Sequence, residues 1–598
     1  MIEGTFSFLK NLGQQQDAKD AIPTEDLSKM AEFSIDEYRP MKVIVIGAGL
    51  TGVAAAIRYR QYVPNVDVNI YEKNDGIGGT WYLNRYPGVA CDNPAHCFAY
   101  TFEHKGDWSA CYSPGHEILQ YINHVVDKWN VRSHIKLQHE VVHMQWDEPS
   151  GQWVVRIRRP LAHDPATFEE FEDRADVVLN GTGALSRWKW PDIEGLHNFK
   201  GPIVHSACWD FGGSTWEEDV KDWGDKNVVV VGLGSSALQI VTALQPKVGK
   251  LFQVCRGQTW VSPPFSVAKL SEMLGRELNG PDTTNLYFTE EEKKLLEFQE
   301  NLFRFRQQIE AQMNTAHKVT LRDSELQKTT RAMFTAHMVK SLEKKPWIVD
   351  LITPDFSVGV KRITAAPGYL EALCADNCDF VHENIKCITS STVEAANGQS
   401  IPADVIICAT GFDTSYKFPF PIIGRNGMSL DEKWSPYPRT YIAACTDGFP
   451  NLFFAFGPNS SVGTTSILGM IEHHVMYSVM ATMKLQRERL KSIEVKPEAV
   501  SDFDNVMESI FSESVPTWYK VGKADGRIVA LWPGSSLHCM RALRYPRWED
   551  FNYERVDKTD NRLFWLGDGM TYSEKTLTGD RTWYINPNYV DVPPTPES

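Results

Sequence analysis

The hydrophobic positions near the start of the chain predict a β-α-β unit. Val43–Ile46 are four consecutive β-branched residues, which is typical of a strand buried on both faces. A glycine loop at 47–52 follows, and an alanine-rich helix is expected from Val53 to about Tyr62. A second apolar run at 66–71 ends at Glu72, and together these segments have the length of one such unit.

The same succession of segments appears a second time along the chain. An apolar strand is predicted at 227–231, a glycine loop at 232–237, and a helix from Leu238 to about Leu244. A second strand at 251–255 ends at Arg256. The sequence therefore predicts an α/β fold with two Rossmann-like dinucleotide-binding domains.

Each glycine loop lies between a predicted strand and a predicted helix, which is the arrangement that binds a pyrophosphate. The first glycine allows a tight turn, the second lets the backbone approach the phosphates, and the third position lets the helix pack on the strand. The helix N-terminus then faces the phosphates with its free N–H groups. The residues expected to contact the cofactors here are Gly47, Gly49, Gly52, Gly232, Gly234, Ser235 and Ser236.

The residues at the ends of the second strands distinguish the two sites. Glu72 lies twenty positions after Gly52, where a carboxylate accepts hydrogen bonds from a ribose 2′-OH. Arg256 lies at the corresponding place in the second unit, where a guanidinium suits a 2′-phosphate. The first site is therefore expected to take FAD or NAD and the second NADP.

Two further strands predict how the chain passes between the domains. One strand ends near Asn180 before a Gly-Thr-Gly turn, and another at 403–408 ends before Ala409-Thr410-Gly411. This order resembles that of flavoproteins whose NADP domain is inserted into the FAD domain. The expected organisation is an N-terminal arm at 1–38, a first FAD part at 39–190, an NADP domain at 191–400 with a charged helical insertion at about 290–345, and a second FAD part at 401–598 with an active-site loop.

Composition narrows the possible partners. The 598 residues carry a formal net charge of −15, which argues against nucleic acid as a ligand. No apolar run reaches the length of a membrane span, no secretory signal is visible, and a cytoplasmic protein is expected. The 11 cysteines contain no C-x-x-C pair, so buried reduced thiols are expected rather than a metal site or a redox dithiol. A monomer or weak homo-oligomer is expected.

Two longer motifs carry a resemblance to a known family. Gly78-Gly79-Thr80-Trp81 is followed by Arg85-Tyr86-Pro87-Gly88 and then by Asp92. The segment 199–210 combines Phe199, Gly201, His205 and Trp209 at the spacing of a second motif. Over roughly residues 40 to 570 the chain resembles type I Baeyer–Villiger monooxygenases, which are class B flavoproteins that use FAD and NADPH.

The resemblance implies roles for particular residues. Arg362 would lie over the flavin, Asp92 would pair with it and hold it in place, and Lys361 would reach the NADP phosphate with Arg256. Trp518, followed by Tyr519, would belong to an active-site loop, and the turn 457–459 would contact the flavin. Gly79, Thr80, Trp81 and Tyr86 join the expected cofactor site, while His205 is expected in the interdomain linker and not in catalysis. Gly257 departs from the Thr or Ser that many relatives have there to hold the 2′-phosphate.

The implied reaction uses O₂ and a small-molecule ketone. A fixed guanidinium stabilises negative charge on the attacking oxygen and on the tetrahedral adduct, which then rearranges to an ester or lactone. An enzyme that oxygenates nitrogen or sulfur is the alternative, and it would not need Arg362. A non-oxygenating flavin reductase would need a redox dithiol, and an inactive binding protein would not need intact motifs. The helical insertion and the N-terminal arm resemble those of fungal enzymes that act on bulky polyketide or terpenoid ketones in secondary metabolism.

Overall fold

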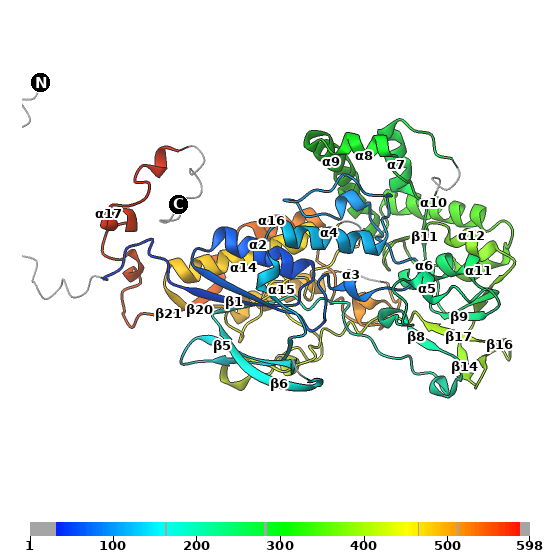
Figure 1. Ribbon diagram of the computed structural model, residues 1–598, viewed down its shortest axis with the longest axis horizontal. Coiled ribbons are helices and arrows are strands. Elements are labelled where there is room, and N and C mark those ends of the chain that lie inside the picture. The colour runs from blue at the N-terminus through cyan, green and yellow to red at the C-terminus, as the bar shows by residue number, and fades with distance from the viewer. Residues whose placement is uncertain (1–30, 162–163, 280–283, 464–465, 511–512, 587–598) are drawn as a thin grey trace, which may run out of the picture. The chain divides into compact units, whose positions relative to one another are not determined.

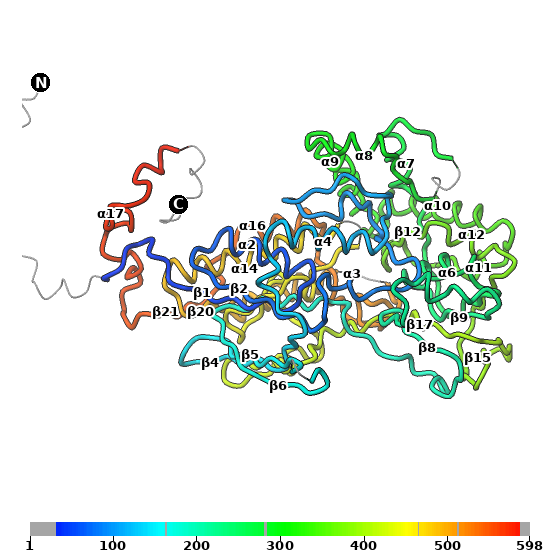
Figure 2. The backbone as a smooth tube through the Cα atoms, in the orientation of Figure 1, coloured from blue at the N-terminus to red at the C-terminus, as the bar shows by residue number. Residues whose placement is uncertain are grey.

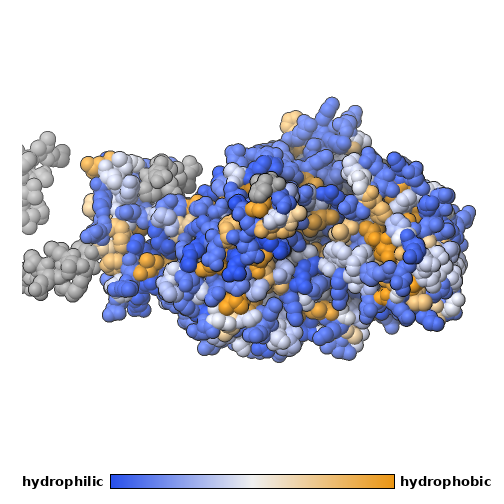
Figure 3. Space-filling model, turned by 60° about the horizontal axis from the view of Figure 1, so that its bottom comes forward, coloured by the Kyte–Doolittle hydropathy of each residue, from blue (hydrophilic) through white to orange (hydrophobic). Residues whose placement is uncertain are grey.

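The computed structural model describes residues 31–161, 164–279, 284–463, 466–510 and 513–586, which form two compact units. The larger unit comprises Met41–Met483 and Lys491–Glu554 and contains both glycine loops (Figures 1 and 2). Polar residues cover most of the face shown in Figure 3, between separate hydrophobic areas. Within the described residues, no helix has both the length and the apolar character that crossing a bilayer requires.

The first glycine loop leaves a five-stranded parallel sheet. Its strands lie in the order β19 (Leu452–Phe454), β7 (Val177–Asn180), β1 (Met41–Ile46), β2 (Val66–Tyr71) and β3 (Ile135–Lys136). The unbroken apolar run of β1 is explained by its burial in the middle of this sheet. Helix α2 (Leu50–Tyr62) begins three residues earlier than the predicted helix, directly after Gly49. The loop therefore lies where the strand order reverses, which is where ligands bind in open α/β sheets.

A second five-stranded parallel sheet carries the second loop. Its order is β13 (Cys378–His382), β10 (Lys250–Cys255), β9 (Asn227–Val231), β17 (Val405–Cys408) and β8 (Ile203–His205), with helix α6 (Ser235–Leu244) after β9. The two Rossmann-like domains are thus confirmed. The boundary expected at residue 401 is wrong, because β17 pairs in register with β9 and β8 and belongs to this sheet.

The stretch expected to be a helical insertion is helical. It contains α8 (Glu290–Leu296), α9 (Gln299–Thr315) and α10 (Glu325–Ser341), and Thr289 closes a capping box at the start of α8. Phe334 and Met338 of α10 are buried in the core of the second domain. Helix α9, in contrast, contacts the short helix η2 (Ala95–Cys97) of the first domain. The insertion therefore touches both domains.

The remaining elements of the larger unit complete the first domain. A mostly antiparallel sheet contains β18 (Ile422–Ile423), β4 (Glu140–Asp147), β5 (Gln152–Leu161) and β6 (Asp164–Ala175). Helix α4 (Gly115–Lys128) precedes it in the chain, and α14 (Leu468–Arg487), α15 (Pro497–Glu508) and α16 (Ser536–Arg544) follow it.

The smaller unit departs from the expected domain assignment. It combines the described residues 31–40, 484–490 and 555–586, whereas the sequence placed everything after 401 in the FAD domain. Arg489 forms a bidentate ion pair with Asp557 at 2.7 and 3.0 Å, and the backbone N–H of Ile35 donates to the carbonyl of Met570. The expected N-terminal arm is therefore partly structured by the C-terminal segment, and its residues 1–30 lie outside the described residues.

Candidate active site

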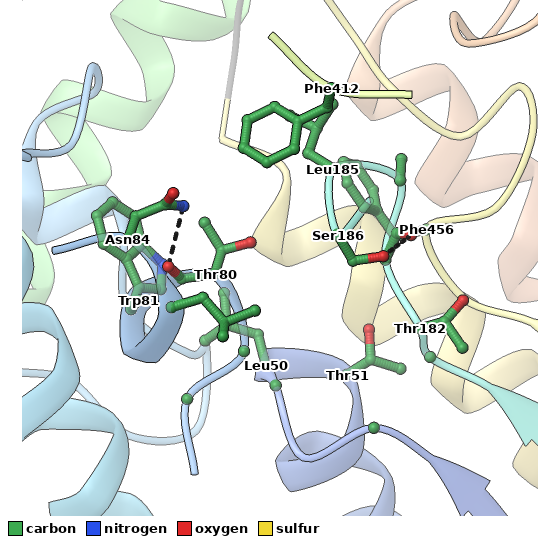
Figure 4. Close-up of a pocket in the computed structure, with 18 of the residues that line it drawn as sticks. Leu50, Thr51, Thr80, Trp81, Asn84, Thr182, Leu185, Ser186, Phe412 and Phe456 are labelled. Atoms are coloured by element: carbon green, nitrogen blue, oxygen red, sulfur yellow. Dashed lines mark hydrogen bonds between the residues drawn. The ribbon is translucent and has the colours of Figure 1, made fainter. Parts of the chain in front are cut away.

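A cavity of about 430 Å³ lies in the larger unit, at the start of α2. Its wall combines the first glycine loop, the first turn of α6 and the chain crossovers between the domains. In Figure 4, Thr80 and Trp81 lie on one side of the cavity, and Leu185, Ser186 and Phe412 lie on the other. Segments that are far apart in the chain therefore share one chamber that is large enough for a ligand.

The first glycine loop has the geometry that a bound dinucleotide needs. Gly47 has a φ of +98°, and a Cβ atom there would lie 2.8 Å from the carbonyl oxygen of Gly181. No side chain caps α2 after Gly49, so its first N–H groups are available to a phosphate. Glu72 is buried in the cavity wall, and its carboxylate accepts hydrogen bonds from the backbone N–H groups of Ala48 (2.8 Å) and Asn74 (2.9 Å). A carboxylate has further lone pairs, which can accept from a ribose hydroxyl.

The second glycine loop reaches the same cavity through α6. Gly232 has a φ of +134°, and α6 likewise begins without a side-chain cap after Gly234. Ser235, Ser236 and Gln239 line the cavity. The N-terminal ends of α2 and α6 therefore both border one chamber.

Tyr86 connects the first family motif to α6. Its hydroxyl donates to Oε1 of Gln239 at 2.9 Å, and Nε2 of Gln239 donates to the carbonyl of Ala90 at 3.0 Å. Burial raises the pKa of Tyr86 to about 12, so this hydroxyl stays protonated and remains a donor. Gln239 was not found from the sequence, because a glutamine in the first turns of a helix carries no signal of its own.

Arg362 and Asp92 meet in the cavity wall. Asp92 accepts from Nε of Arg362 at 2.9 Å and from Nη2 at 2.9 Å, and Nη1 donates to the carbonyl of Val462 at 3.4 Å. Burial alone would lower the pKa of Arg362, but the Asp92 carboxylate raises it above its ordinary value, so the guanidinium keeps its charge. Because Asp92 holds the Nε side, the edge between Nη1 and Nη2 has hydrogens left for a ligand oxygen.

One buried hydroxyl group beside this pair, that of Tyr519, has no hydrogen-bond partner within the described residues. The hydroxyl of Ser461, a residue of the cavity wall, instead faces that of Tyr416. Burial raises the pKa of Tyr519 to about 12, and Arg362 and Asp92 are close enough to act on it in opposite directions. Its neighbour Trp518 lines the cavity, as expected. A buried unpaired hydroxyl is costly, so the hydroxyl of Tyr519 suits a site that is completed by bound molecules.

Arg256 and Lys361 both lie outside the cavity wall. Arg256 is exposed at the end of β10, and Nζ of Lys361 donates to the carbonyl of Gln258 at 3.2 Å. Partial burial lowers the pKa of Lys361. Gly257 has open space around its Cα, since a Cβ atom there would meet no other described atom within 4 Å. A guanidinium at the end of this strand, with a lysine bonded to the carbonyl two residues further along, fits a 2′-phosphate.

His205 is the last residue of β8 in the second sheet and does not line the cavity, whereas the sequence placed it in the linker between the domains. Its ring stacks on Trp188 at 4.5 Å, and its Nδ1 accepts from the backbone N–H of Ala207. Its Nε2 therefore carries the proton and donates to Oγ1 of Thr410 at 3.2 Å. Burial lowers the pKa of His205 to about 4, so the ring is neutral near pH 7. It contacts the two crossovers through Trp188 and Thr410.

The expected site residues fall into two groups. Those that line the cavity are Gly47, Gly49, Glu72, Gly79, Thr80, Trp81, Tyr86, Asp92, Ser235, Ser236, Arg362 and Trp518. Those outside its wall are Gly52, Gly232, Gly234, Arg256 and Lys361. Gly52 has a packing role, because a Cβ atom there would lie 2.1 Å from the carbonyl oxygen of Gly47. The sequence missed most of the apolar wall, which includes Phe98, Leu185, Phe412, Phe456, Ile467 and Ile471.

Comparison with known proteins agrees with this geometry. Residues 45–113 match the family described as NAD(P)-binding Rossmann-like domain. The chain is 36% identical over 557 residues to the FAD-binding monooxygenase tazF of Aspergillus terreus, covering 92% of this chain and 95% of that protein. It is 32% identical over 503 residues to a Baeyer-Villiger monooxygenase of Pseudomonas aeruginosa, covering 83% and 88% respectively. Among solved structures, an oxidized steroid monooxygenase bound to NADP aligns with a TM-score of 0.70 at 26% identity, covering 86% of this chain and all of that chain.

Fold, cavity and comparisons together define a flavoprotein monooxygenase that uses two dinucleotides. More narrowly, the chain belongs to the type I Baeyer–Villiger monooxygenases. The expectation of FAD and NADP as its cofactors is confirmed by this membership.

Proposed function

We propose that this enzyme inserts one oxygen atom of O₂ beside the carbonyl of a ketone and releases an ester or lactone. The observation that carries the proposal is the side-on pairing of Arg362 with Asp92 in a cavity that both glycine loops reach. An always charged group with a free donor edge is what ketone oxygenation needs at the reacting oxygen. Oxygenation of nitrogen or sulfur would give no reason for this pair.

Different residues around the cavity would bind the two cofactors. The first loop and Glu72 would hold FAD, and the second loop with Ser235 would hold NADP. Arg256 and Lys361 would bind the 2′-phosphate. Bound FAD, once reduced by NADPH, supplies the activated oxygen.

Arg362 and Asp92 would act on the reacting atoms. The free edge of Arg362 would donate to the ketone oxygen and stabilise the negative charge that grows on it during attack. Asp92 would keep the guanidinium in that orientation, since two bonds of 2.9 Å fix its plane. Trp518 would close the cavity against water.

The lining of the cavity supports a bulky apolar ketone. Leu185, Phe412, Phe456 and Ile471 offer aromatic and aliphatic surface for such a ligand. The solved relative at 26% identity is a steroid monooxygenase, and the relative at 36% identity comes from a fungus. We therefore propose a polycyclic polyketide or terpenoid ketone from secondary metabolism as the substrate class.

Product analysis tests this function. The purified enzyme with FAD and NADPH would be given ketones from cyclohexanone to polycyclic compounds, together with a thioether, under ¹⁸O₂. The expected result is an ester or lactone carrying one ¹⁸O, with loss of that product in Arg362→Met but not in Arg331→Met, a change at an exposed arginine of α10. Sulfoxide formation without ester from any ketone would overturn the proposal.

A further inference from the structure

Part of the cavity wall is stabilised by residues that do not belong to the first domain. Phe98 lines the cavity and packs edge-on against Trp81, with ring centroids 5.2 Å apart. Phe98 directly follows η2 and begins an irregular segment that continues to Gly106. Irregular backbone needs partners for its carbonyl groups, and two of these carbonyls are bonded by the helical insertion.

Arg306 of α9 supplies these partners. Its Nη2 donates to the carbonyl of Ala99 at 2.8 Å, and its Nη1 donates to the carbonyl of Tyr100 at 2.9 Å. The residue is only 8% exposed, and Oε1 of Glu310, one turn further along α9, accepts from its Nε at 3.2 Å. One buried guanidinium thus bonds the two residues that follow Phe98, and Figures 1 and 2 show α9 in green beside the blue segment before α4.

The same contact extends to the first glycine loop. The hydroxyl of Tyr100 donates to the carbonyl of Leu50 at 2.7 Å, and Leu50 begins α2 and lines the cavity. A displacement of the Tyr100 backbone would therefore move both Phe98 and the N-terminus of α2.

Other contacts fix the insertion against this segment. The ring of His96 lies edge-on to Phe288 and Phe305, with centroids at 4.9 and 5.0 Å. The backbone N–H of Cys111 donates to the carbonyl of Leu286 at 2.8 Å. The insertion cannot shift by itself without breaking these contacts, so they hold Arg306 in place.

We infer that Arg306 is a positioning residue, through which the helical insertion holds the Phe98–Trp81 wall and so sets how bulky a ketone the cavity accepts. The inference about substrate size rests on the proposed function, but the inference about the wall does not. Helix α10 of the same insertion is packed in the core of the second domain. The shape of the cavity therefore also depends on the position of the second domain.

Three variants test the inference in the full-length FAD-loaded enzyme. Arg306→Met removes the donors and keeps most of the side-chain volume, and Arg306→Lys keeps one donor group. Arg304→Met is the matched control, since Arg304 lies on the same helix with an exposed ion pair to Glu300. Amide hydrogen exchange of residues 97–102 is expected to accelerate about tenfold or more in Arg306→Met, less in Arg306→Lys, and not in Arg304→Met.

Kinetics supply the second measurement. The KM for a polycyclic ketone is expected to rise about fivefold or more in Arg306→Met, while that for cyclohexanone and both kcat values stay within about twofold. Unchanged exchange in both Arg306 variants, or an equal rise in KM for small and bulky ketones, would overturn the inference. If Arg306→Met does not fold, Arg306→Lys and Glu310→Gln decide by the same readouts. If no ketone is converted, the proposed function fails, and hydrogen exchange still decides whether Arg306 holds the wall.

Discussion

The replacement Asp92→Asn tests the Arg362–Asp92 pair most directly, because it changes charge without changing shape. In the native enzyme both carboxylate oxygens accept hydrogen bonds from Arg362 at 2.9 Å. The amide of asparagine can accept only one of them, and its NH₂ group then faces an N–H of the guanidinium, donor against donor. Arg362 should therefore lose the orientation that presents its free edge to the cavity.

The expected loss follows from the burial of the pair. Removing one partner of a fully buried ion pair costs about 3–5 kcal/mol. The two side chains are 23% and 25% exposed, so solvent screens part of the charge, and about 2–3 kcal/mol remains as a reasonable range. If that loss falls on the oxygen-transfer step, kcat for ester formation decreases about 30- to 150-fold.

The assay separates this step from cofactor binding. Ester formation would be followed by gas chromatography, and reduction of bound FAD by NADPH would be followed from its absorbance in the absence of O₂. Hydrogen peroxide released per NADPH should increase, since oxygen activation is no longer coupled to the ketone. The control is Asp127→Asn, which disturbs an exposed pair with Arg132 (side chains 61% and 52% exposed) and should leave every rate unchanged.

Two results would refute the reasoning. If Asp92→Asn keeps kcat within about threefold, the carboxylate does not orient the guanidinium for the chemical step. If the variant loses ester formation only because it no longer retains FAD, Asp92 acts on binding and not on Arg362.

Three further predictions follow from other parts of the structure. The double variant Arg256→Ala, Lys361→Ala should raise the KM for NADPH about tenfold or more without changing that for NADH, and an equal change for both coenzymes would remove these residues from the 2′-phosphate site. Gly52→Ala should displace the first loop, because its Cβ would lie 2.1 Å from a loop carbonyl, and FAD affinity measured by flavin fluorescence should fall; unchanged affinity would contradict this packing role. His474 is buried, and burial lowers its pKa to about 4. As the pH falls, this histidine is therefore protonated in the unfolded chain before it is protonated in the folded one, and up to about 3 kcal/mol of the free energy of unfolding should be lost between pH 6.5 and 4. His474→Leu should reduce this loss in denaturant titrations at those pH values, and an unaltered pH dependence would show that other groups cause it.

Much of the fold could be predicted because short, local sequence patterns determine it. Four consecutive β-branched residues are typical of a strand whose two faces are both buried, and β1 is buried in the middle of its sheet. The glycine loops could be placed because the positive φ of Gly47 and Gly232 is a backbone requirement of those positions. The end of the NADP domain was misplaced, because the strand 405–408 carries no mark of which sheet it joins, and only pairing with β9 and β8 assigns it.

The candidate site was foreseen only where a motif marked it. Arg362 and Asp92 are 270 positions apart, and their pairing was expected from family resemblance and not from any local pattern. Gln239, Ser461 and Phe98 were missed, since a polar or aromatic residue without a motif is compatible with many environments.

The sequence by itself therefore determined the two β-α-β units, their glycine loops and the side chains at the ends of their second strands. These features depend on backbone geometry and hydrophobic periodicity, which act over only a few residues. The tertiary structure alone decided that both loops reach one cavity, that Arg306 of the insertion bonds the segment after Phe98, and that residues 555–586 join the segment 31–40 in a separate unit. These features depend on packing between segments far apart in the chain, where burial and hydrogen-bond satisfaction are settled only when the whole domain has formed.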